Sequence, residues 1–247
     1  MFRLPQLVRL LIHNGADVHS TSSDGETVFH LAIATYEPMC LELVKSFVEA
    51  DGNTAICNAQ GETALHIAIK CRYTSVAELL LSHNVSLPSG ILPFTLWQHS
   101  SLQLIRLLIC NRADVHSTTP EGETVFHLTI AHYNEFMCLE LMRSFVEADC
   151  NTTICNTQGE TALRAAVKCE CTSLVELLLL HNVPLPPSIL PPVLLRYPPP
   201  QLVQLLMCNG AGAHSTSSEG ETVLHLLFLH VIADYNSGVH AYFSNLL

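Results

Sequence analysis

Residues 61–69, Gly-Glu-Thr-Ala-Leu-His-Ile-Ala-Ile, have the pattern of a capped helix start. Thr63 is the N-cap candidate, because its hydroxyl can accept a hydrogen bond from a free amide of the first helical turn. We expect the helix to follow directly. Its apolar side is formed by Ala64, Leu65, Ile67, Ala68 and Ile69.

A second helix is predicted shortly afterwards. Val76, Leu79 and Leu80 fall at the spacing i, i+3 and i+4, which places them on one helical face. Asn84 stands where a residue that tolerates a left-handed conformation would end this helix. The segment therefore reads as helix, turn, helix and loop.

This segment is one copy of a repeat. The string Gly-Glu-Thr recurs with its glycine at 25, 61, 122, 159 and 220, and corresponding copies lie 97 or 98 residues apart. Residues 53–84 and 151–182 are identical at 22 of 32 positions. Repeats of this kind are typical of solenoids, in which each helical pair buries its apolar face against its neighbours.

The residues resemble the ankyrin repeat family, whose pattern runs G-x-T-P-L-H-x-A-A, then a V-V-x-L-L-L helix, then G-A-D-V-N. Residues 61–68 match the first element with Ala64 in place of proline, and residues 15–19, Gly-Ala-Asp-Val-His, match the last with His19 in place of asparagine. The resemblance implies an all-α ankyrin-repeat solenoid of helix-turn-helix units with short β-hairpin loops. We expect a single array over residues 1–247, beginning with a partial repeat and ending with an irregular one. The approximate bounds are 1–16, 17–52, 53–86, 87–113, 114–150, 151–184, 185–212 and 213–247.

Some positions depart from the family pattern. Arg112 stands where sister repeats have Gly15 and Gly210, so a left-handed backbone there would cost about 1 kcal/mol relative to glycine. The repeats over 87–113 and 185–212 lack G-x-T, so their hairpins should be truncated. The prolines between 191 and 200 should make the first helix of the later repeat short or absent.

The histidine of the motif has a structural role in the family. The resemblance implies that it bonds the threonine hydroxyl with one ring nitrogen and a backbone carbonyl with the other. Arg164 replaces it in one repeat, where we expect a looser turn. The structural residues are Thr27, His30, Thr63, His66, Thr124, His127, Thr161, Thr222 and His225.

Partners of ankyrin proteins usually lie on the concave face formed by hairpin tips and inner helices. The glutamate after each motif glycine would give one edge a line of negative charge, which suits a basic or mixed-charge protein segment. The alternative is that these glutamates only favour a helix N-terminus. The candidate partner-binding residues are Ser23, Asp24, Glu26, Thr35, Gln60, Glu62, Lys70, Glu121, Glu123, His132, Gln158, Glu160, Lys168, Glu219 and Glu221.

Composition excludes several other classes. A net charge of −11 argues against nucleic acid, whose affinity comes mainly from Lys and Arg. No apolar run reaches the roughly 20 residues of a membrane helix. Met1–Ile12 does not read as a signal peptide, so we expect an intracellular, cytoplasmic protein.

The sequence gives little support for catalysis or metal binding. Fourteen His and ten Cys invite a metal site, but no C-x-x-C is followed by a second pair at zinc spacing, and repetition accounts for eight of the ten cysteines. The candidate catalytic groups are copied between repeats, as scaffold residues are. We expect no catalytic residue, no bound metal and no cofactor.

The sequence thus predicts a non-enzymatic protein-interaction module, either a stand-alone adaptor or the repeat region of a larger receptor or scaffold. The alternatives are a Cys/His metal- or thiol-dependent protein and a decayed repeat fragment without selected function. The chain opens inside a repeat, and neither end has a polar capping repeat. We therefore also expect self-association through the apolar faces of Leu4–Ile12 and Val223–Ile232.

Overall fold

The structure is a computed structural model that describes residues 4–35, 37–83, 87–186, 188–194, 196, 198–217 and 219–228. It divides into two compact parts, which we call the N-terminal body (Met1–Tyr133) and the C-terminal body (Asn134–Leu247).

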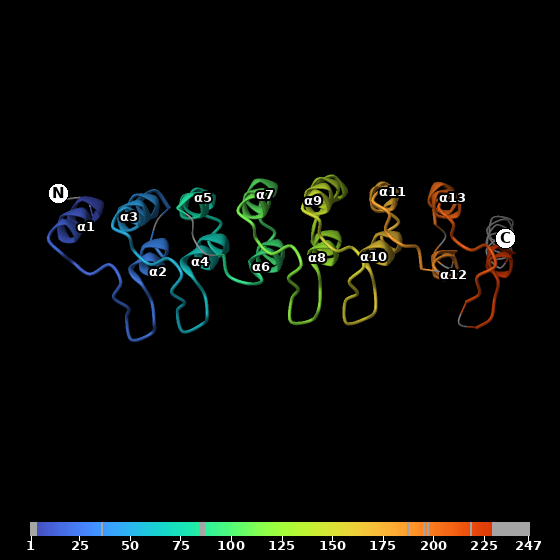
Figure 1. Ribbon diagram of the computed structural model, residues 1–247, viewed down its shortest axis with the longest axis horizontal. Helices are drawn as coiled ribbons and strands as arrows, with labels where there is room; N and C mark the ends of the chain where they lie inside the picture. Colours follow the sequence, from blue (N-terminus) through green and yellow to red (C-terminus); the bar gives the residue numbers. More distant parts are fainter. Residues whose placement is uncertain are drawn as a thin grey trace, which may run out of the picture. The chain divides into compact units, whose positions relative to one another are not determined.

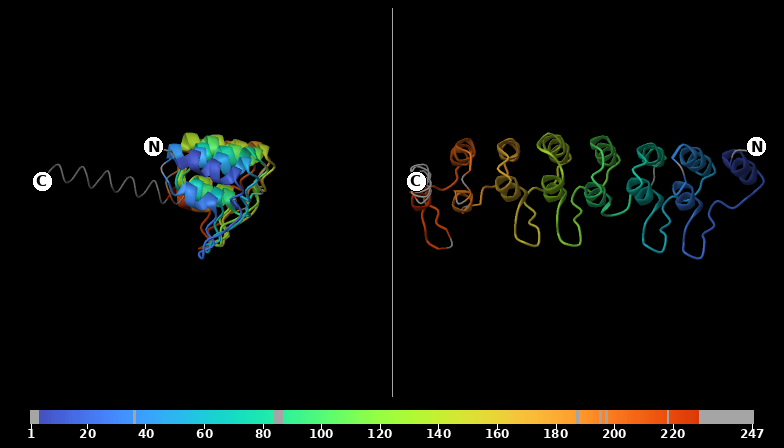
Figure 2. Two further views of the ribbon diagram at one scale, coloured as in Figure 1. Left: turned by 90° about the vertical axis from the view of Figure 1, so that its left-hand side faces the viewer. Right: turned by 180° about the vertical axis from the view of Figure 1, so that it is seen from behind.

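The N-terminal body consists of paired helices in two layers (Figure 1). The inner layer lies next to the projecting loops, and the outer layer covers it (Figure 2). Neighbouring helices pack within each layer, as α2 does on α4 and α3 on α5. The inner helices are α2 (Val28–Ile33), α4 (Ala64–Lys70), α6 (Ile91–Trp97) and α8 (Val125–His132). The outer helices are α1 (Leu4–His13), α3 (Glu37–Glu49), α5 (Thr74–Ser82) and α7 (Leu102–Cys110).

The C-terminal body repeats the same plan (Figure 1). Its outer helices are α9 (Glu135–Glu147), α11 (Thr172–Leu180) and α13 (Pro200–Cys208), and its inner helices are α10 (Ala162–Lys168) and α12 (Leu190–Leu194). Residues 223–228 begin a further helix. The expectation of an all-α fold of paired helices is confirmed, and in the described part of the chain extended structure is limited to isolated bridges.

The core follows the helical periodicity of the sequence. In α4 and α5, Leu65, Ile69, Val76 and Leu80 are at most 1% exposed, because they face the neighbouring helices. Leu79 is only half-buried, although its spacing places it near the same face. Most of the predicted apolar positions therefore form the interface between the layers, where each fully buried aliphatic side chain contributes about 1.5–3 kcal/mol.

The hairpins come in two forms. Three repeats close the loop with one antiparallel bridge, such as Thr21 to Thr27. In the repeats that begin at 53 and 151 an asparagine side chain holds the turn: Asn58 Oδ1 accepts the backbone amides of Gln60 and Glu62, both at 3.0 Å. The loops preceding α6 and α12 form no such bridge in the residues described there, as expected from their missing G-x-T.

Two departures from the family pattern have the expected effect. Arg112 has a φ of 64° and Gly15 a φ of 87°, so the arginine occupies the left-handed position that glycine takes in its sister repeat. Helix α12 has five residues, which confirms that the proline cluster shortens it. Asn84 and the tail beyond residue 228 lie outside the described residues.

Candidate functional site

The best-defined polar cluster of the fold is the cap of α2. Thr27 donates its backbone N–H to His30 Nδ1 (3.1 Å), and the Thr27 hydroxyl oxygen lies 2.8 Å from the same nitrogen. Since Nδ1 accepts a backbone N–H, the proton of the neutral ring is on Nε2, which donates to the Glu62 carbonyl oxygen at 2.9 Å. The Glu26 carboxylate lies 3.9 Å from Nδ1, but a nitrogen that already accepts a hydrogen bond makes no ion pair with it.

The threonine and histidine pair recurs, as the family resemblance implied. In each copy the threonine Oγ1 lies 2.8–3.0 Å from the histidine Nδ1. The ring thus satisfies a threonine amide that would otherwise have no partner inside the helix. The further copies are Thr63 with His66, Thr124 with His127, and Thr222 with His225.

One repeat has only half of this cap. Thr161 Oγ1 accepts the backbone N–H of Arg164 at 3.3 Å, but the arginine has no ring nitrogen to return the bond to the Thr161 amide. The replacement of histidine by Arg164 therefore removes the return bond, as we expected from the looser turn. It also leaves a long cationic side chain at a position that elsewhere holds a packed ring.

Burial changes the acidity of two of these histidines. Burial lowers the pKa of His66 and of His127 below the ordinary value of 6.5, against the opposing influence of the nearby carboxylates of Glu62 and Glu123. Both rings therefore remain neutral over a wider pH range than free histidine. A neutral ring is what the cap requires, since Nδ1 must accept a hydrogen bond.

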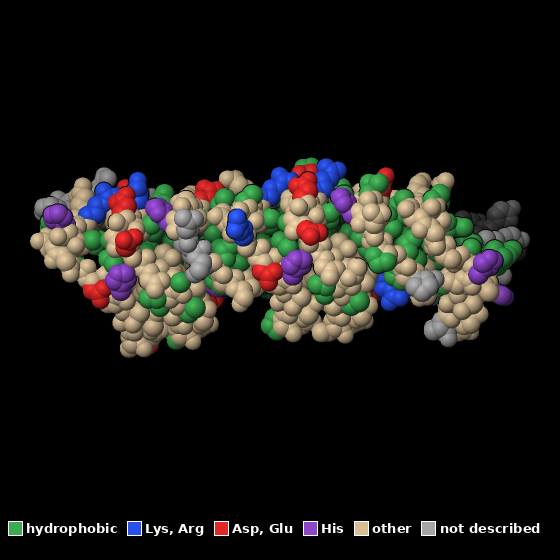
Figure 3. All heavy atoms as spheres, viewed as in Figure 1, with side chains coloured by type: hydrophobic (Ala, Val, Ile, Leu, Met, Phe, Trp, Pro, Cys, Tyr) green, Lys and Arg blue, Asp and Glu red, His purple; other side chains and the backbone are tan. Residues whose placement is uncertain are grey.

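The motif glutamates do not all present free charge. Glu62 forms an ion pair with Lys70, and Glu160 forms one with Lys168, in each case across the length of an inner helix. Glu26 Oε1 accepts Asn58 Nδ2 at 3.1 Å, which ties one hairpin to the next. On the face drawn in Figure 3 the tips of the loops carry mainly neutral polar and backbone atoms. At least two of the five glutamates are thus neutralised within their own repeats.

The candidate partner-binding residues fall into two groups. Some lie in the projecting loops, and others lie at or near the C-terminal ends of inner helices. The half-buried Thr35 donates its hydroxyl to the Ala32 carbonyl oxygen at 2.6 Å and so serves its own helix. The loop group comprises Ser23, Asp24, Glu26, Gln60, Glu62, Glu121, Glu123, Gln158, Glu160, Glu219 and Glu221. The helix-end group comprises Thr35, Lys70, His132 and Lys168.

The N-terminal body contains an aromatic cluster that was not predicted from the sequence. Trp97, the last residue of α6, is 59% exposed, and its ring lies 5.0 Å from that of His132 at the end of α8. The ring centre of His99 also lies 5.0 Å from that of His132. The backbone of His99 is left-handed, with a φ of 52°. Burial, together with the neighbouring His99, lowers the pKa of His132. One signal for this cluster is present in the sequence: the single tryptophan occupies the same position in its repeat as Lys70, which is the last residue of an inner helix.

The cysteines differ in exposure and, among the described residues, belong to no metal-binding group. Cys40, Cys138 and Cys150 are buried. Burial raises the pKa of Cys138 to about 11, which disfavours the thiolate that metal binding and nucleophilic attack require. No group of three or more His, Cys, Asp or Glu with metal-binding geometry occurs among the described side chains. Nor does any helix within that part of the chain have the length and hydropathy to cross a membrane.

Known ankyrin repeat proteins are similar to this chain in sequence. The family model described as ankyrin repeats (3 copies) matches residues 2–89 and 96–185. The mouse (Mus musculus) B-cell lymphoma 3 protein homolog is 28% identical over 170 residues, which cover 66% of this chain and 37% of that protein. The mouse neurogenic locus notch homolog protein 1 is 26% identical over 166 residues, 64% of this chain and 6% of that protein. This chain therefore corresponds to a minor part of the length of these relatives.

Solved structures resemble the chain in fold. An ankyrin repeat domain from Acinetobacter baumannii superposes with a TM-score of 0.63 at 16% identity, covering 72% of this chain and 92% of that one. The ankyrin repeat domain of Bcl-3 superposes with a TM-score of 0.52 at 17% identity, covering 90% of this chain and 87% of that one.

Proposed function

Because the chain belongs to the ankyrin repeat family, we propose that it is a non-enzymatic interaction module that holds a protein partner against its inner helices and hairpin tips. Ankyrin repeat domains are generic protein-binding modules. Repeat scaffolds of this kind offer a pre-formed surface, so a partner is bound without the cost of ordering the site.

The observation that carries this proposal is the exposure of Trp97. A tryptophan that is 59% exposed at the end of an inner helix leaves a large apolar ring available for contact. Tryptophan is among the residues most enriched at the energetic centres of protein interfaces. The imidazole of His132 packs edge-on against it and supplies polar groups beside the apolar ring.

The charges favour a mixed-charge partner over a purely basic one. Glu62 and Glu160 are already paired with Lys70 and Lys168, so these repeats offer both signs of charge side by side. Asp24, Glu121 and Glu219 are exposed in the loops and remain available to basic side chains. A partner segment with alternating charge would complement both kinds of position.

The relatives suggest the context of such a module. The matched parts of the B-cell lymphoma 3 protein homolog and of the notch homolog belong to much longer proteins. We propose that this chain acts either as an adaptor or as the repeat region of a larger receptor or scaffold. An antibody against the folded chain distinguishes these, because the endogenous protein migrates near 27.2 kDa in the first case and well above it in the second.

The test of the binding surface is a matched pair of variants. Trp97→Ala removes the exposed ring on the inner layer, whereas Phe136→Ala removes a ring that is 70% exposed on the outer helix α9. A partner that co-purifies with the wild-type chain is identified and titrated against both variants. We expect W97A to weaken binding at least tenfold and F136A to change it by less than twofold. Equal effects of both variants, or a loss with F136A alone, would reject the inner-layer surface.

A second candidate, self-association, rests on separate apolar surface. Helix α1 exposes Leu4, Leu7, Leu10 and Leu11 by 43–55%, and residues 223–228 expose Leu224 and Phe228 by 64–65%. Apolar patches of this kind promote contacts between copies of a chain. We propose that these two faces support weak self-association.

A further inference from the structure

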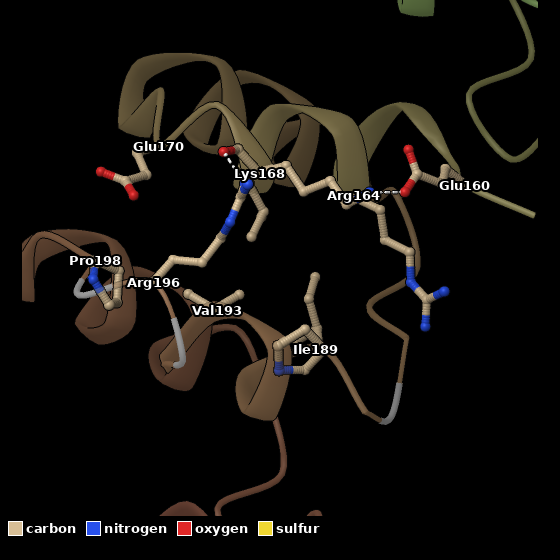
Figure 4. A pocket seen from close by; sticks show the side chains of 10 residues that line it. Glu160, Arg164, Lys168, Glu170, Ile189, Val193, Arg196 and Pro198 are labelled. Carbon is tan, nitrogen blue, oxygen red and sulfur yellow. Dashed lines mark hydrogen bonds and ion pairs between the residues drawn. The ribbon is translucent and has the colours of Figure 1, made fainter. Parts of the chain in front are cut away.

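The C-terminal body contains a cavity of about 410 Å³ between α10 and α12 (Figure 4). Its apolar wall is formed by Val167 from α10 and by Ile189 and Val193 from the segment that contains α12. Arg164 and Arg196 lie at its margin and bring two guanidinium groups to the site. The volume falls within the range of ligand-binding pockets, roughly 300–1,000 Å³.

The arginines differ in how much of their hydrogen-bonding capacity is used. Arg196 Nη1 donates to the Lys168 carbonyl oxygen at 2.9 Å, which fixes the side chain over the cavity. Arg164 as a residue is half-buried, and its guanidinium makes no hydrogen bond or ion pair with any residue that the structure describes. Lys168 is paired with Glu160, and Glu170 lies at the opposite end of the cavity from Arg164 (Figure 4). The end of the cavity at Arg164 therefore carries an unsatisfied positive charge.

The internal duplication shows how this site arises. In the corresponding repeat of the N-terminal body the position of Arg164 is His66 and that of Pro192 is Phe94. The two rings pack edge to face with their centres 4.9 Å apart and fill the equivalent space. Replacement of both rings opens the space, and Arg164 places a positive charge at one end of it. The position of Arg196 is Gln98 in the earlier repeat, so the second positive charge is also particular to the later copy.

We propose that this cavity binds a segment of a partner protein in which an aliphatic side chain enters between Val167 and Val193 and an adjacent Asp or Glu carboxylate pairs with Arg164. This rests on the proposed function as a protein-binding module and names the chemistry of one contact. An arginine and a carboxylate form a charge-assisted, bidentate hydrogen-bonded pair, and a half-buried site strengthens it. The cavity volume suits one or two side chains.

The same surface does not suit a polyanion. Glu160 and Glu170 line the cavity together with the arginines, and the chain as a whole has a net charge of −11. A single carboxylate beside an apolar group can meet the half-buried Arg164 near Glu160, which is already paired with Lys168, and away from Glu170. This site thus takes an acidic residue of the partner, whereas the exposed loop carboxylates of the proposed surface take basic ones.

The probe is a display library of random heptapeptides, panned on the wild-type chain and on the double variant Arg164→His/Pro192→Phe. The double variant restores the residues of the earlier repeat, which the fold accommodates there, and it should fill the cavity while keeping the helical content. We expect wild-type selections to combine an aliphatic residue with a neighbouring Asp or Glu, and the filled variant to lose these peptides. Unchanged circular dichroism of the variant verifies that it is folded.

Single peptides then isolate the charge contact. Against Arg164→Gln, a selected peptide should bind at least tenfold more weakly, while its Asp→Asn or Glu→Gln version should bind wild type and R164Q equally. Selection of basic peptides, recovery of the same peptides on the filled variant, or equal affinity for R164Q would overturn the proposal. A partner that is lost with W97A but retained with R164H/P192F would reject the cavity and leave the proposed function standing. Insensitivity of partner binding to W97A would reject the proposed surface, independently of the peptides bound at Arg164.

Discussion

Nε2 of His30 lies 2.9 Å from the carbonyl oxygen of Glu62, a residue 32 positions further along the chain. The same ring accepts the Thr27 amide with its other nitrogen. One side chain therefore caps its own helix and ties it to the hairpin of the next repeat. In a solenoid, where each repeat contacts mainly its neighbours, such a bond contributes directly to the interface between repeats.

We expect His30→Ala to lower the free energy of unfolding by about 1–3 kcal/mol, because it leaves the buried Thr27 amide without its acceptor and removes the bond to the Glu62 carbonyl oxygen, which keeps only the Asn58 amide. Urea unfolding followed by circular dichroism measures the change. His225→Ala is the matched control, since His225 makes the same pair with Thr222 but is exposed. A loss for H225A as large as that for H30A would contradict the role of the bond between repeats.

Replacement of Arg112 by glycine should stabilise the chain. Arg112 has a φ of 64°, a conformation that costs a residue with a side chain about 1 kcal/mol relative to glycine. We expect Arg112→Gly to raise the free energy of unfolding by about 1 kcal/mol and therefore to raise the urea midpoint. Arg112→Ala removes the side chain but keeps the strained backbone, so it should change the midpoint little. If R112A is as stabilising as R112G, the gain does not come from the backbone.

Stability should fall as the pH drops below neutral. Burial holds the pKa of His66 and His127 below 6.5, the value of the free side chain, so the unfolded chain binds more protons than the folded chain as the pH decreases. Their contribution is fully present above pH 6.5 and is lost as the pH falls through the folded pKa. Urea midpoints at about pH 7.5 and pH 5.5 measure this. The variant His66→Gln/His127→Gln should show a flatter dependence; an unchanged slope would assign the effect to other groups.

The local parts of this structure were predictable because their causes lie within a few residues. Thr27 and His30 are three positions apart on one turn, and Arg112 occupies a position that glycine fills in the sister repeats. The ion pair of Glu62 with Lys70 was not predicted, since the two residues are eight positions apart and nothing in the sequence shows that the hairpin folds back along α4.

The cavity and the exposed tryptophan could not be predicted from the sequence, for a different reason. The cavity depends on Arg164 and Pro192 lining the same space, which their counterparts His66 and Phe94 fill with packed rings in the earlier copy. Trp97 lies in a repeat without the G-x-T string, so an alignment of the motif did not include it. Both features arise where the repeat pattern is broken. Departures from the consensus therefore locate the surfaces that distinguish one copy from another.

Self-association should follow from the apolar face of α1. Leu4, Leu7 and Leu11 recur at helical spacing and are 45%, 43% and 53% exposed, so they form a stripe that a second copy can bury. Sedimentation velocity at about 10–100 µM should therefore show a mean mass that rises with concentration.

The variant Leu7→Gln/Leu11→Gln should reduce this rise, because it removes two of the three apolar contacts while glutamine keeps a good helix propensity. Leu180→Gln is the control, since Leu180 is 72% exposed but belongs to a different helix, as the last residue of α11. A mass that stays at that of the monomer across the range would refute self-association. An equal reduction by L180Q would attribute self-association to exposed leucines in general and not to this stripe, because Leu180 lies outside it.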